Sequence, residues 1–271
     1  MPSEEVVRCE RVVKTYRTPS GEVRALRGVD ASFPEAALVA VAGPSGSGKS
    51  SLLRLIAGMD RPTSGTVIVA GESIGSASTH RRRRLRRERV GYVFQRPSDN
   101  FLAHLTVGEH LERVAAPDAD VAGVLDALGI SARVAHRPGE LSGGEQQRAA
   151  FAQALVSGAR VVVADEPTAE LDTESAARVL DAFESVNREF GVTIVMVTHD
   201  LVAARRAKRQ VRLRDGQLVV EGQPADPVGT DGRLRLPDDA IDAIAGSDLE
   251  VDVRDGEVRI RRRGEGGLTG G

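Results

Sequence analysis

A short apolar run that leads directly into a glycine-rich octapeptide constrains the fold of this chain more than any other feature. The run spans residues 38–42, and the octapeptide is Gly43-Pro44-Ser45-Gly46-Ser47-Gly48-Lys49-Ser50. A continuous apolar run of this length is typical of a strand buried in a parallel sheet. Residues 49–59 have the apolar spacing of a helix. The order strand, glycine-rich turn, helix predicts an α/β fold.

The octapeptide matches the phosphate-loop pattern G-x-x-x-x-G-K-[ST]. In that pattern the glycines let backbone N–H groups close around a polyphosphate, the lysine adds a point charge and the serine offers a magnesium ligand. Lys49 and Ser50 would lie at a helix N-terminus, which favours phosphate. A flexible turn is the simpler interpretation of a Gly/Ser-rich segment. The flanking strand and helix instead favour a nucleotide site formed by Gly43 through Ser51.

A second apolar run, residues 161–164, ends in Asp165 and Glu166. The carboxyl ends of parallel strands face the ligand crevice, so both carboxylates are expected there. Asp165 is placed to hold magnesium, and Glu166 to orient and polarise the attacking water in γ-phosphoryl transfer. Without the phosphate loop, an acidic turn at the end of a strand would be the better interpretation.

Ser142-Gly143-Gly144-Glu145 has the S-x-x-E spacing of a capping box, which predicts a helix over residues 143–156. A capped helix start with two glycines is also a surface that a γ-phosphate can approach closely. Both interpretations can hold together. The segment lies far along the chain from Lys49, so it need not reach its own phosphate loop and could face that of another subunit.

Composition restricts the class of protein. A chain of 271 residues has room for one large α/β domain and a small appendage. The formal net charge of −2 gives no reason to expect a nucleic-acid partner, and the single cysteine, Cys9, suits a reducing cytosol. No apolar run approaches the about 20 residues that span a bilayer. We therefore expect no intrinsic membrane span, and any membrane crossing would belong to another chain.

The phosphate loop, the stretch Leu141-Ser142-Gly143-Gly144-Glu145-Gln146-Gln147-Arg148 and the Asp165-Glu166 pair, in this order, resemble the nucleotide-binding domain of ATP-binding cassette (ABC) proteins. The resemblance covers residues 5–222. It implies an α/β P-loop cassette with a mostly parallel core sheet, a helical subdomain that carries the signature Ser142-Gly143-Gly144, and an antiparallel β subdomain. It also implies ATP and Mg²⁺ as cofactors, with Ser50, Gln95 and Asp165 at the metal.

The resemblance further assigns roles to four residues. Tyr16 is similar to the aromatic residue that stacks on adenine, and Gln95 to the glutamine that senses magnesium and the membrane partner. Asp172 resembles the aspartate that communicates across the dimer, and His199 the histidine that contacts the γ-phosphate, so Glu166, His199 and Gln95 form the expected catalytic set. Ser51 departs from the common threonine but keeps the hydroxyl.

The family resemblance implies two cassettes that close over two ATP molecules, as a homodimer or with a related ATPase, and drive a separate transmembrane permease. The cassette would be cytoplasmic and peripheral to the cell membrane. Residues 21–30, 86–95 and 105–110 resemble the lipoprotein-release, macrolide-export and FtsE group. The alternative is a soluble ABC ATPase that acts on DNA or ribosomes; against it, the chain has one cassette and no heptad insertion. The basic cluster of residues 81–89 is typical of a solvated helix face, with lipid or permease contact as the other possibility.

The last part of the chain has a different composition. We expect a linker over residues 223–231, a small β-rich module over 232–263 and a disordered glycine-rich tail over 264–271. Asp255-Gly256 between alternating apolar residues predicts a hairpin. The module faintly resembles half of the swapped-hairpin fold of AbrB-type factors, which would make it a dimerisation element. A hairpin that packs on the cassette without a separate role is equally compatible with the sequence.

Overall fold

The computed structural model describes residues 5–19, 21–222, 249–254 and 257–262, and the chain divides into two compact units, Met1–Pro224 and Ala225–Gly271. The first unit contains a six-stranded sheet in the order β10-β9-β3-β8-β7-β6. Five of its strands are parallel, and β10 pairs antiparallel with β9. The strands are β3 (Leu38–Ala42), β6 (Val90–Val93), β7 (Val161–Asp165), β8 (Thr193–Thr198), β9 (Arg209–Arg214) and β10 (Gln217–Gly222). The expected mostly parallel core sheet is confirmed.

Each central strand of this sheet is buried on both faces. In β3, Val39 and Val41 point into one apolar core while Leu38, Ala40 and Ala42 point into the other. The same alternation runs through β7 and β8. Continuous apolar strands are required here because both faces of the sheet are covered.

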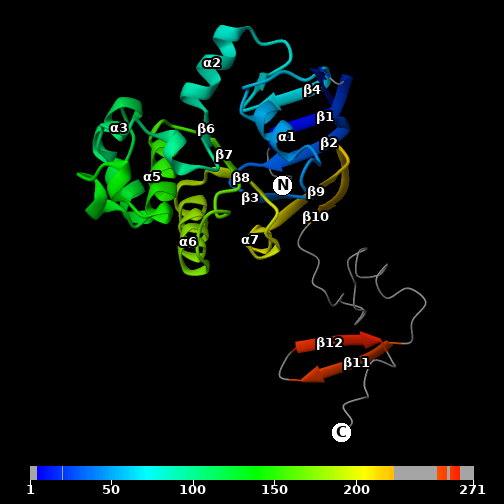
Figure 1. Ribbon diagram of the computed structural model, residues 1–271. Coiled ribbons are helices and arrows are strands. Elements are labelled where there is room, and N and C mark those ends of the chain that lie inside the picture. Colours follow the sequence, from blue (N-terminus) through cyan, green and yellow to red (C-terminus); the bar gives the residue numbers. More distant parts are fainter. Residues whose placement is uncertain (1–4, 20, 223–248, 255–256, 263–271) are drawn as a thin grey trace. The chain divides into compact units, whose positions relative to one another are not determined.

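One face carries helix α1 and a second, antiparallel sheet, as Figure 1 shows. The sheet order is β2-β1-β4-β5. Its strands are β1 (Glu5–Thr18), β2 (Gly21–Pro34), β4 (Ser64–Val69) and β5 (Glu72–Ser73), and α1 spans Lys49–Ile56. The sequence predicted that this helix would extend to Met59. The helix ends earlier because Gly58 adopts φ 62° and the N–H groups of Gly58 and Met59 close a terminal turn on Leu55 and Arg54.

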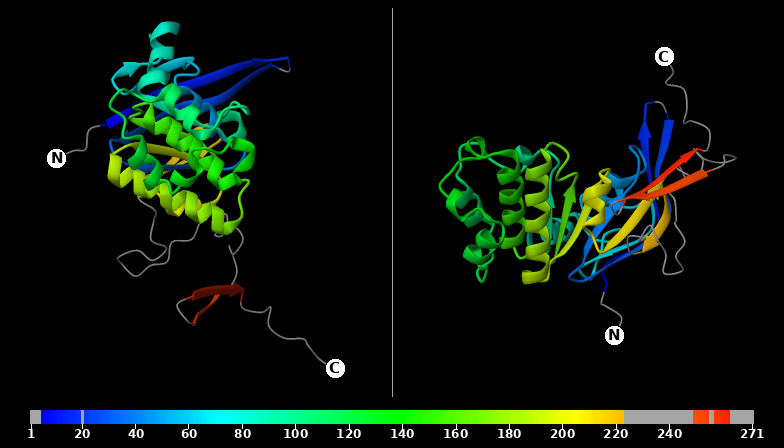
Figure 2. Two further views of the ribbon diagram at one scale, coloured as in Figure 1. Left: turned by 90° about the vertical axis from the view of Figure 1, so that its left-hand side faces the viewer. Right: turned by 90° about the horizontal axis from the view of Figure 1, so that it is seen from below.

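The opposite face is covered by the helical subdomain, which both views of Figure 2 also show. Its longest members are α5 and α6, and the stacked rings of Phe151 and Phe183, 4.0 Å between centroids, join them. The helices are α3 (Val107–Val114), α4 (Val121–Ala127), α5 (Gly143–Val156), α6 (Thr173–Phe190) and α7 (Leu201–Arg205), with 3₁₀ turns at Pro97–Asn100, Ser131–Arg133 and Pro138–Glu140. The expected helical and antiparallel β subdomains are both confirmed.

The basic cluster forms helix α2 (Thr79–Glu88), which is anchored by the buried Leu85. Arg82 and Arg86 donate to the carbonyl oxygen of Gly58, whereas Arg81 and Arg83 are exposed. Among the helices of the described residues, none is long and apolar enough to cross a membrane.

The second unit contains the antiparallel hairpin β11 (Leu249–Arg254) and β12 (Glu257–Arg262). The expected hairpin is confirmed in its strands. The turn residues Asp255-Gly256, the linker over 223–231, the first part of the β-rich module and the tail over 264–271 lie outside the described residues.

Candidate active site

The phosphate loop runs from the end of β3 to the start of α1 and depends on glycine at two crowded positions. Gly43 has φ 153° and Gly48 has φ 104°. A Cβ atom on Gly43 would lie 2.1 Å from the carbonyl oxygen of Leu213, and one on Gly48 would lie 2.3 Å from that of Ala25. The loop is therefore pressed against β9 and β2, and only glycine fits at these two places.

Lys49 is buried at the centre of this loop. Its Nζ donates to the carbonyl oxygens of Gly43 at 2.7 Å and Pro44 at 2.9 Å. The ammonium group is thus held inside the loop by the loop's own carbonyls. A phosphate that enters the loop would find this charge already in position.

Two acids follow each other at the carboxyl end of β7. Asp165 is half-buried, and burial, followed by the neighbouring charge of Glu166, raises the pKa of its carboxyl group. Glu166 adopts φ 46°, a left-handed conformation that costs a non-glycine residue about 1–2 kcal/mol. Its N–H donates to the carbonyl oxygen of Val197 at 2.9 Å, which fixes the turn. Such strain is typical of functional sites.

His199 follows β8, the neighbour of β7, and contacts Glu166 directly. Its Nδ1 lies 2.9 Å from Glu166 Oε2, and its backbone N–H donates to the same oxygen at 3.3 Å. Glu166 is largely buried while the His199 side chain is 67% exposed. The imidazole therefore keeps an open side toward the pocket described next.

A pocket of about 530 Å³ collects these groups from four separate segments. Gln95, which follows β6 by two residues, reaches it as well. The pocket-lining residues are Ser45, Gly46, Gly48, Lys49, Ser50, Ser51, Gln95, Asp165, Glu166 and His199. The expected catalytic set and the expected metal ligands thus border one cavity together with the phosphate loop.

The donors in this pocket fit a magnesium ion bound with a nucleotide. Ser50, Gln95 and Asp165 offer hydroxyl, amide and carboxylate oxygens, the ligand type that Mg²⁺ prefers. No cluster of three or more acidic, histidine or cysteine side chains with metal-site geometry occurs among the residues that the structure describes. The protein would therefore supply only part of the coordination shell, which is usual where phosphate oxygens and water supply the rest.

Tyr16 does not line this pocket. Its hydroxyl donates to Asp60 Oδ2 at 3.2 Å, and the ammonium group of Lys14 lies 4.8 Å from the centre of its ring. The structure therefore ties Tyr16 to the turn after α1, and its stacking on adenine stays a prediction.

The signature segment also lies apart from the lining of the pocket. Ser142 caps α5: its hydroxyl accepts from the N–H of Glu145 at 3.3 Å, and Glu145 Oε2 accepts from the N–H of Ser142 at 2.8 Å. The predicted capping box and the predicted span of the helix are both confirmed. Ser142 and Gly143 are exposed, and a Cβ atom on Gly143 would lie 3.0 Å from the side chain of Leu171. Asp172, one residue on, caps α6 and accepts from the N–H of Ser175 at 2.8 Å.

Sequence reasoning missed one residue of the site, Tyr92 on β6. Its hydroxyl donates to Asp165 Oδ2 at 3.2 Å. Burial, followed by the charge of Asp165, raises the pKa of Tyr92, so the hydroxyl keeps its proton and acts as the donor. No sequence signal pointed to this contact, because it depends on β6 pairing with β7.

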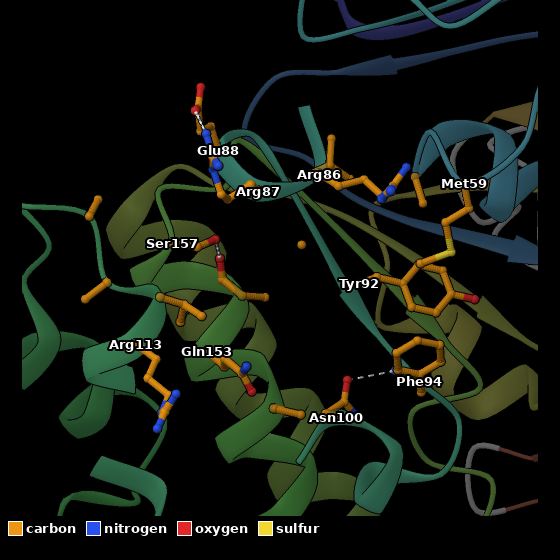
Figure 3. A pocket seen from close by; sticks show the side chains of 18 of the residues that line it. Met59, Arg86, Arg87, Glu88, Tyr92, Phe94, Asn100, Arg113, Gln153 and Ser157 are labelled. Atoms are coloured by element: carbon orange, nitrogen blue, oxygen red, sulfur yellow. Dashed lines mark hydrogen bonds and ion pairs between the residues drawn. The ribbon is translucent and has the colours of Figure 1, made fainter. Parts of the chain in front are cut away.

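A second cavity, of about 810 Å³, is lined by Tyr92 on the side away from Asp165 (Figure 3). We call this cavity the groove. It is bounded by the ends of α1 and α2, by β6, and by α3 and α5. Its lining includes Met59, Tyr92, Phe94 and Arg113. Phe94 is 38% exposed, and Arg113 is exposed as well. The groove therefore combines apolar side chains with three arginines, Arg86, Arg87 and Arg113, and two acids, Glu88 and Asp99.

Comparison with known proteins gives concordant results. The ABC transporter family matches residues 26–169. Over 222 residues, or 79% of the chain, the sequence is 39% identical to the macrolide export ATP-binding/permease protein MacB of Hyphomonas neptunium. The chain spans about a third, 34%, of the length of that relative.

Two solved structures illustrate the similarity of fold. A dimeric post-hydrolysis state of the ATP-binding cassette MJ0796, bound to ADP and Pi, has a TM-score of 0.70 and 32% identity, covering 80% of this chain and 98% of that one. CbiO1 of Clostridium perfringens, part of an ABC transporter complex, has a TM-score of 0.74 at 24% identity, covering 89% and 95%. The chain therefore belongs to the ABC transporter family and is one of its ATP-hydrolysing cassettes.

Proposed function

We propose that this chain is the motor of a transporter complex. Two cassettes close head to tail over two ATP molecules, and the closure drives a transmembrane permease of the macrolide-export, lipoprotein-release or FtsX-like kind. The observation that carries the proposal is the single pocket that joins the phosphate loop, Asp165, Glu166, Gln95 and His199. Phosphoryl transfer needs each of these kinds of group: a phosphate cradle, a metal-binding acid and a group that orients water.

Binding begins at the loop. The backbone N–H groups at the start of α1 and the ammonium group of Lys49 receive the β- and γ-phosphates of ATP. Lys49 then exchanges its contacts with the Gly43 and Pro44 carbonyls for contacts with phosphate oxygens. Ser50, Gln95 and Asp165 would hold the magnesium ion. When bound, that ion would neutralise charge on the phosphate oxygens during transfer.

Glu166 is the group that prepares the attacking water. Its Oε2 is engaged by the Nδ1 and the backbone N–H of His199. Of the described residues none bonds its Oε1, so that oxygen is available to accept a proton from water. His199 fixes the carboxylate and, with its exposed edge, is placed to contact the γ-phosphate.

The site of one copy requires a second copy. Ser142 and Gly143 are exposed and lie outside the lining of their own pocket. The N–H of Ser142 is taken by Glu145, so the backbone N–H of Gly143 at the start of α5 is the group that suits an anion. In the proposed dimer Ser142 and Gly143 cover the γ-phosphate bound to the partner copy, so the affinity for ATP is higher in the closed state and ATP shifts the population toward closure. This accords with the dimeric state of the similar cassette MJ0796.

The permease is supported by the relative MacB, whose name joins an ATP-binding part to a permease. The groove offers a place for a cytoplasmic segment of such a permease, because it adjoins Gln95 through Phe94 and combines apolar and basic side chains. A segment with apolar side chains and an acidic residue would complement Phe94 and Arg113.

The test of this function is the Glu166→Gln variant. It keeps the size of the side chain and its contacts but removes the basic oxygen, so we expect ATP to bind, hydrolysis to fall by at least about 100-fold, and a dimer to accumulate. Gel filtration with ATP measures the dimer, and the double variant Lys49→Ala/Glu166→Gln is the matched control that should stay monomeric. A monomer for both variants would contradict the head-to-tail mechanism.

The partner is identified with the same trapped variant. An affinity-tagged Glu166→Gln chain is purified with ATP in mild detergent, and co-purifying proteins are determined by mass spectrometry. A polytopic membrane protein in near-stoichiometric amount is the expected result. Ribosomal or DNA-bound proteins in its place would move the function to the soluble class and leave the ATPase chemistry intact.

A further inference from the structure

Tyr92 lies between the groove and the nucleotide pocket and touches residues of both. It belongs to β6, which pairs in parallel with β7, and its register partner there is Val163. From this position the side chain reaches two residues along β7, where its hydroxyl donates to Asp165 Oδ2 at 3.2 Å. Asp165 lines the nucleotide pocket, and Tyr92 lines the groove.

The ring of Tyr92 forms part of the wall of the groove. It is tilted by 59° against the ring of Phe94, with 4.7 Å between centroids. Figure 3 shows the Tyr92 ring between Met59 and Phe94, with its hydroxyl pointing away from the groove. A molecule seated in the groove would therefore touch the ring pair, while the hydroxyl end of the same side chain stays on Asp165.

The hydrogen bond from Tyr92 to Asp165 is long, so it is sensitive to small movements of the Tyr92 ring. At 3.2 Å it exceeds the usual 2.5–3.0 Å of an O–H···O bond. A displacement of the ring by a few tenths of an ångström would shorten it into that range or break it. Hydrogen bonds from such outer partners orient metal ligands, and their loss typically costs 10–100-fold in metal affinity or activity.

We propose that Tyr92 is a positioning residue for Asp165: it orients the carboxylate that takes the metal, and it transmits occupation of the groove to that carboxylate. This link runs through a side chain and is separate from the backbone connection between Phe94 and Gln95. The proposal rests on the proposed function, in which Asp165 holds magnesium and a permease segment fills the groove.

The first experiment measures metal affinity in the Tyr92→Phe variant. Mn²⁺ is titrated into the full chain with a non-hydrolysable ATP analogue, and free Mn²⁺ is read by electron paramagnetic resonance. We expect affinity about 10-fold weaker than in the unaltered chain, with unchanged affinity for the analogue in the absence of metal. Affinity within twofold of the unaltered chain would refute the positioning role.

The chain offers a matched control for this substitution. Tyr16 donates to Asp60 at the same 3.2 Å, outside the lining of the nucleotide pocket. Tyr16→Phe removes the same kind of hydroxyl at the same bond length and keeps the aromatic ring. With the analogue at saturation in every variant, its affinity for Mn²⁺ should stay within twofold of that of the unaltered chain. An equal loss in both variants would assign the effect to general destabilisation and would overturn the proposal.

The second experiment reads the hydrogen bond by fluorescence. The chain has two tyrosines and no tryptophan, so Tyr92 is the sole tyrosine of the Tyr16→Phe variant. Emission of a tyrosine is quenched when its hydroxyl donates to a carboxylate. We therefore expect brighter emission after the further change Asp165→Ala, and a change of emission when Mg²⁺ and the analogue are added together but not when the analogue is added alone. Emission that is indifferent to both changes would contradict the contact.

The third experiment tests the link to the groove. Arg113→Cys places a thiol in the groove, and the natural Cys9 is 2% exposed, so a bulky apolar maleimide would label the new site selectively. The label stands in for the occupant. We expect it to change Mn²⁺ affinity by at least threefold, and to have no effect when the Tyr92→Phe change is also present. The same label on Arg188→Cys, an exposed site on α6 outside the groove, should have no effect in either background.

The outcomes separate this inference from the proposed function. If the unaltered chain does not bind Mn²⁺ with the ATP analogue, the metal role of Asp165 fails and the proposed function fails with it. If it binds, but the label acts equally with and without the Tyr92→Phe change, the proposed function stands and Tyr92 is not the link.

Discussion

Gly46 and Gly48 share a left-handed backbone in the phosphate loop but have very different surroundings. Gly46 has φ 78° and no atom within 4 Å of the place where a Cβ would lie. At Gly48, with φ 104°, the added carbon would lie 2.3 Å from the Ala25 carbonyl oxygen and 2.9 Å from the Leu26 side chain. At Gly46 a side chain would meet only backbone strain, whereas at Gly48 it would also be excluded sterically.

This difference predicts unequal effects of alanine. Gly46→Ala should cost about 1–2 kcal/mol, the cost of a left-handed backbone alone. Gly48→Ala adds overpacking of roughly 1–3 kcal/mol and forces the loop away from β2, so it should also abolish ATP binding. Denaturant unfolding and binding of a fluorescent ATP analogue measure the two effects. Equal stability losses in the two variants would show that the contact with Ala25 is not rigid.

Residue types at strand ends were readable from the sequence, and contacts between strands were not. Asp165 and Glu166 could be placed because the pair follows an apolar run, and parallel strands end at one edge. His199 was placed by the family resemblance, and it too follows a strand of that sheet. Tyr92 could not, because its role depends on β6 lying next to β7. Tyr16 shows the converse: the family pattern assigns it to adenine, while its hydroxyl is engaged by Asp60.

At the scale of elements, the start of helix α5 concentrates several interactions on one carboxylate. Glu145 closes the capping box with Ser142 and pairs with Arg133, whose Nε lies 2.7 Å from its Oε1. The Arg133 hydrogen bond, followed by the Ser142 backbone N–H, lowers the pKa of Glu145 from 4.5 to about 2. The ionised carboxylate of Glu145 therefore anchors the start of α5, which carries the signature segment, to Arg133.

The lowered pKa predicts a pH-dependent contribution to stability. A carboxyl group whose pKa is lower in the folded state stabilises the fold above its unfolded value and loses that effect as pH falls. Glu145→Gln should therefore cost about 1 kcal/mol near neutral pH, and the cost should shrink as pH falls from about 4.5 toward 2. Urea unfolding across this range measures it. Glu112→Gln, on the exposed side of α3, is the control, and a cost for Glu145→Gln that does not vary with pH would contradict the ionic role.

Element boundaries were predictable where a local signal existed. The capping box gave the start of α5, and the apolar runs gave β3 and β7 almost to the residue. The strand before Gln95 spans Val90–Val93 and ends there because the N–H of Phe94 is taken by the side chain of Asn100 at 3.3 Å. That competition involves a loop six residues away and leaves no trace in the periodicity of the strand.

At the scale of the whole molecule, the pairing of residues across the hairpin of the second unit bears on how the chain assembles. The register of β11 and β12 pairs Val251 with Ile260 and Val253 with Val258, and it pairs Glu250 with Arg261. Two apolar pairs thus alternate with pairs of an acid and an arginine, and Leu249 opposes Arg262 at the end of the ladder. A lone two-stranded hairpin is marginally stable in water, so such a pairing pattern favours a hairpin that is covered by another surface.

We predict that this covering surface is the hairpin of a second copy. A chain truncated after residue 224 keeps the whole cassette, so it should keep its affinity for ATP and its hydrolysis per site, yet associate more weakly in the absence of ATP. Val251→Lys in the full chain should weaken association to a similar degree, because an ammonium group at an apolar pair costs more in a buried interface than at a free surface.

Glu250→Lys, at a charged pair, is the matched control for the same added side chain. Analytical ultracentrifugation measures association. If Val251→Lys and the truncation both associate like the unaltered chain, the hairpin does not dimerise the cassettes, and their pairing depends on ATP and the signature segment alone.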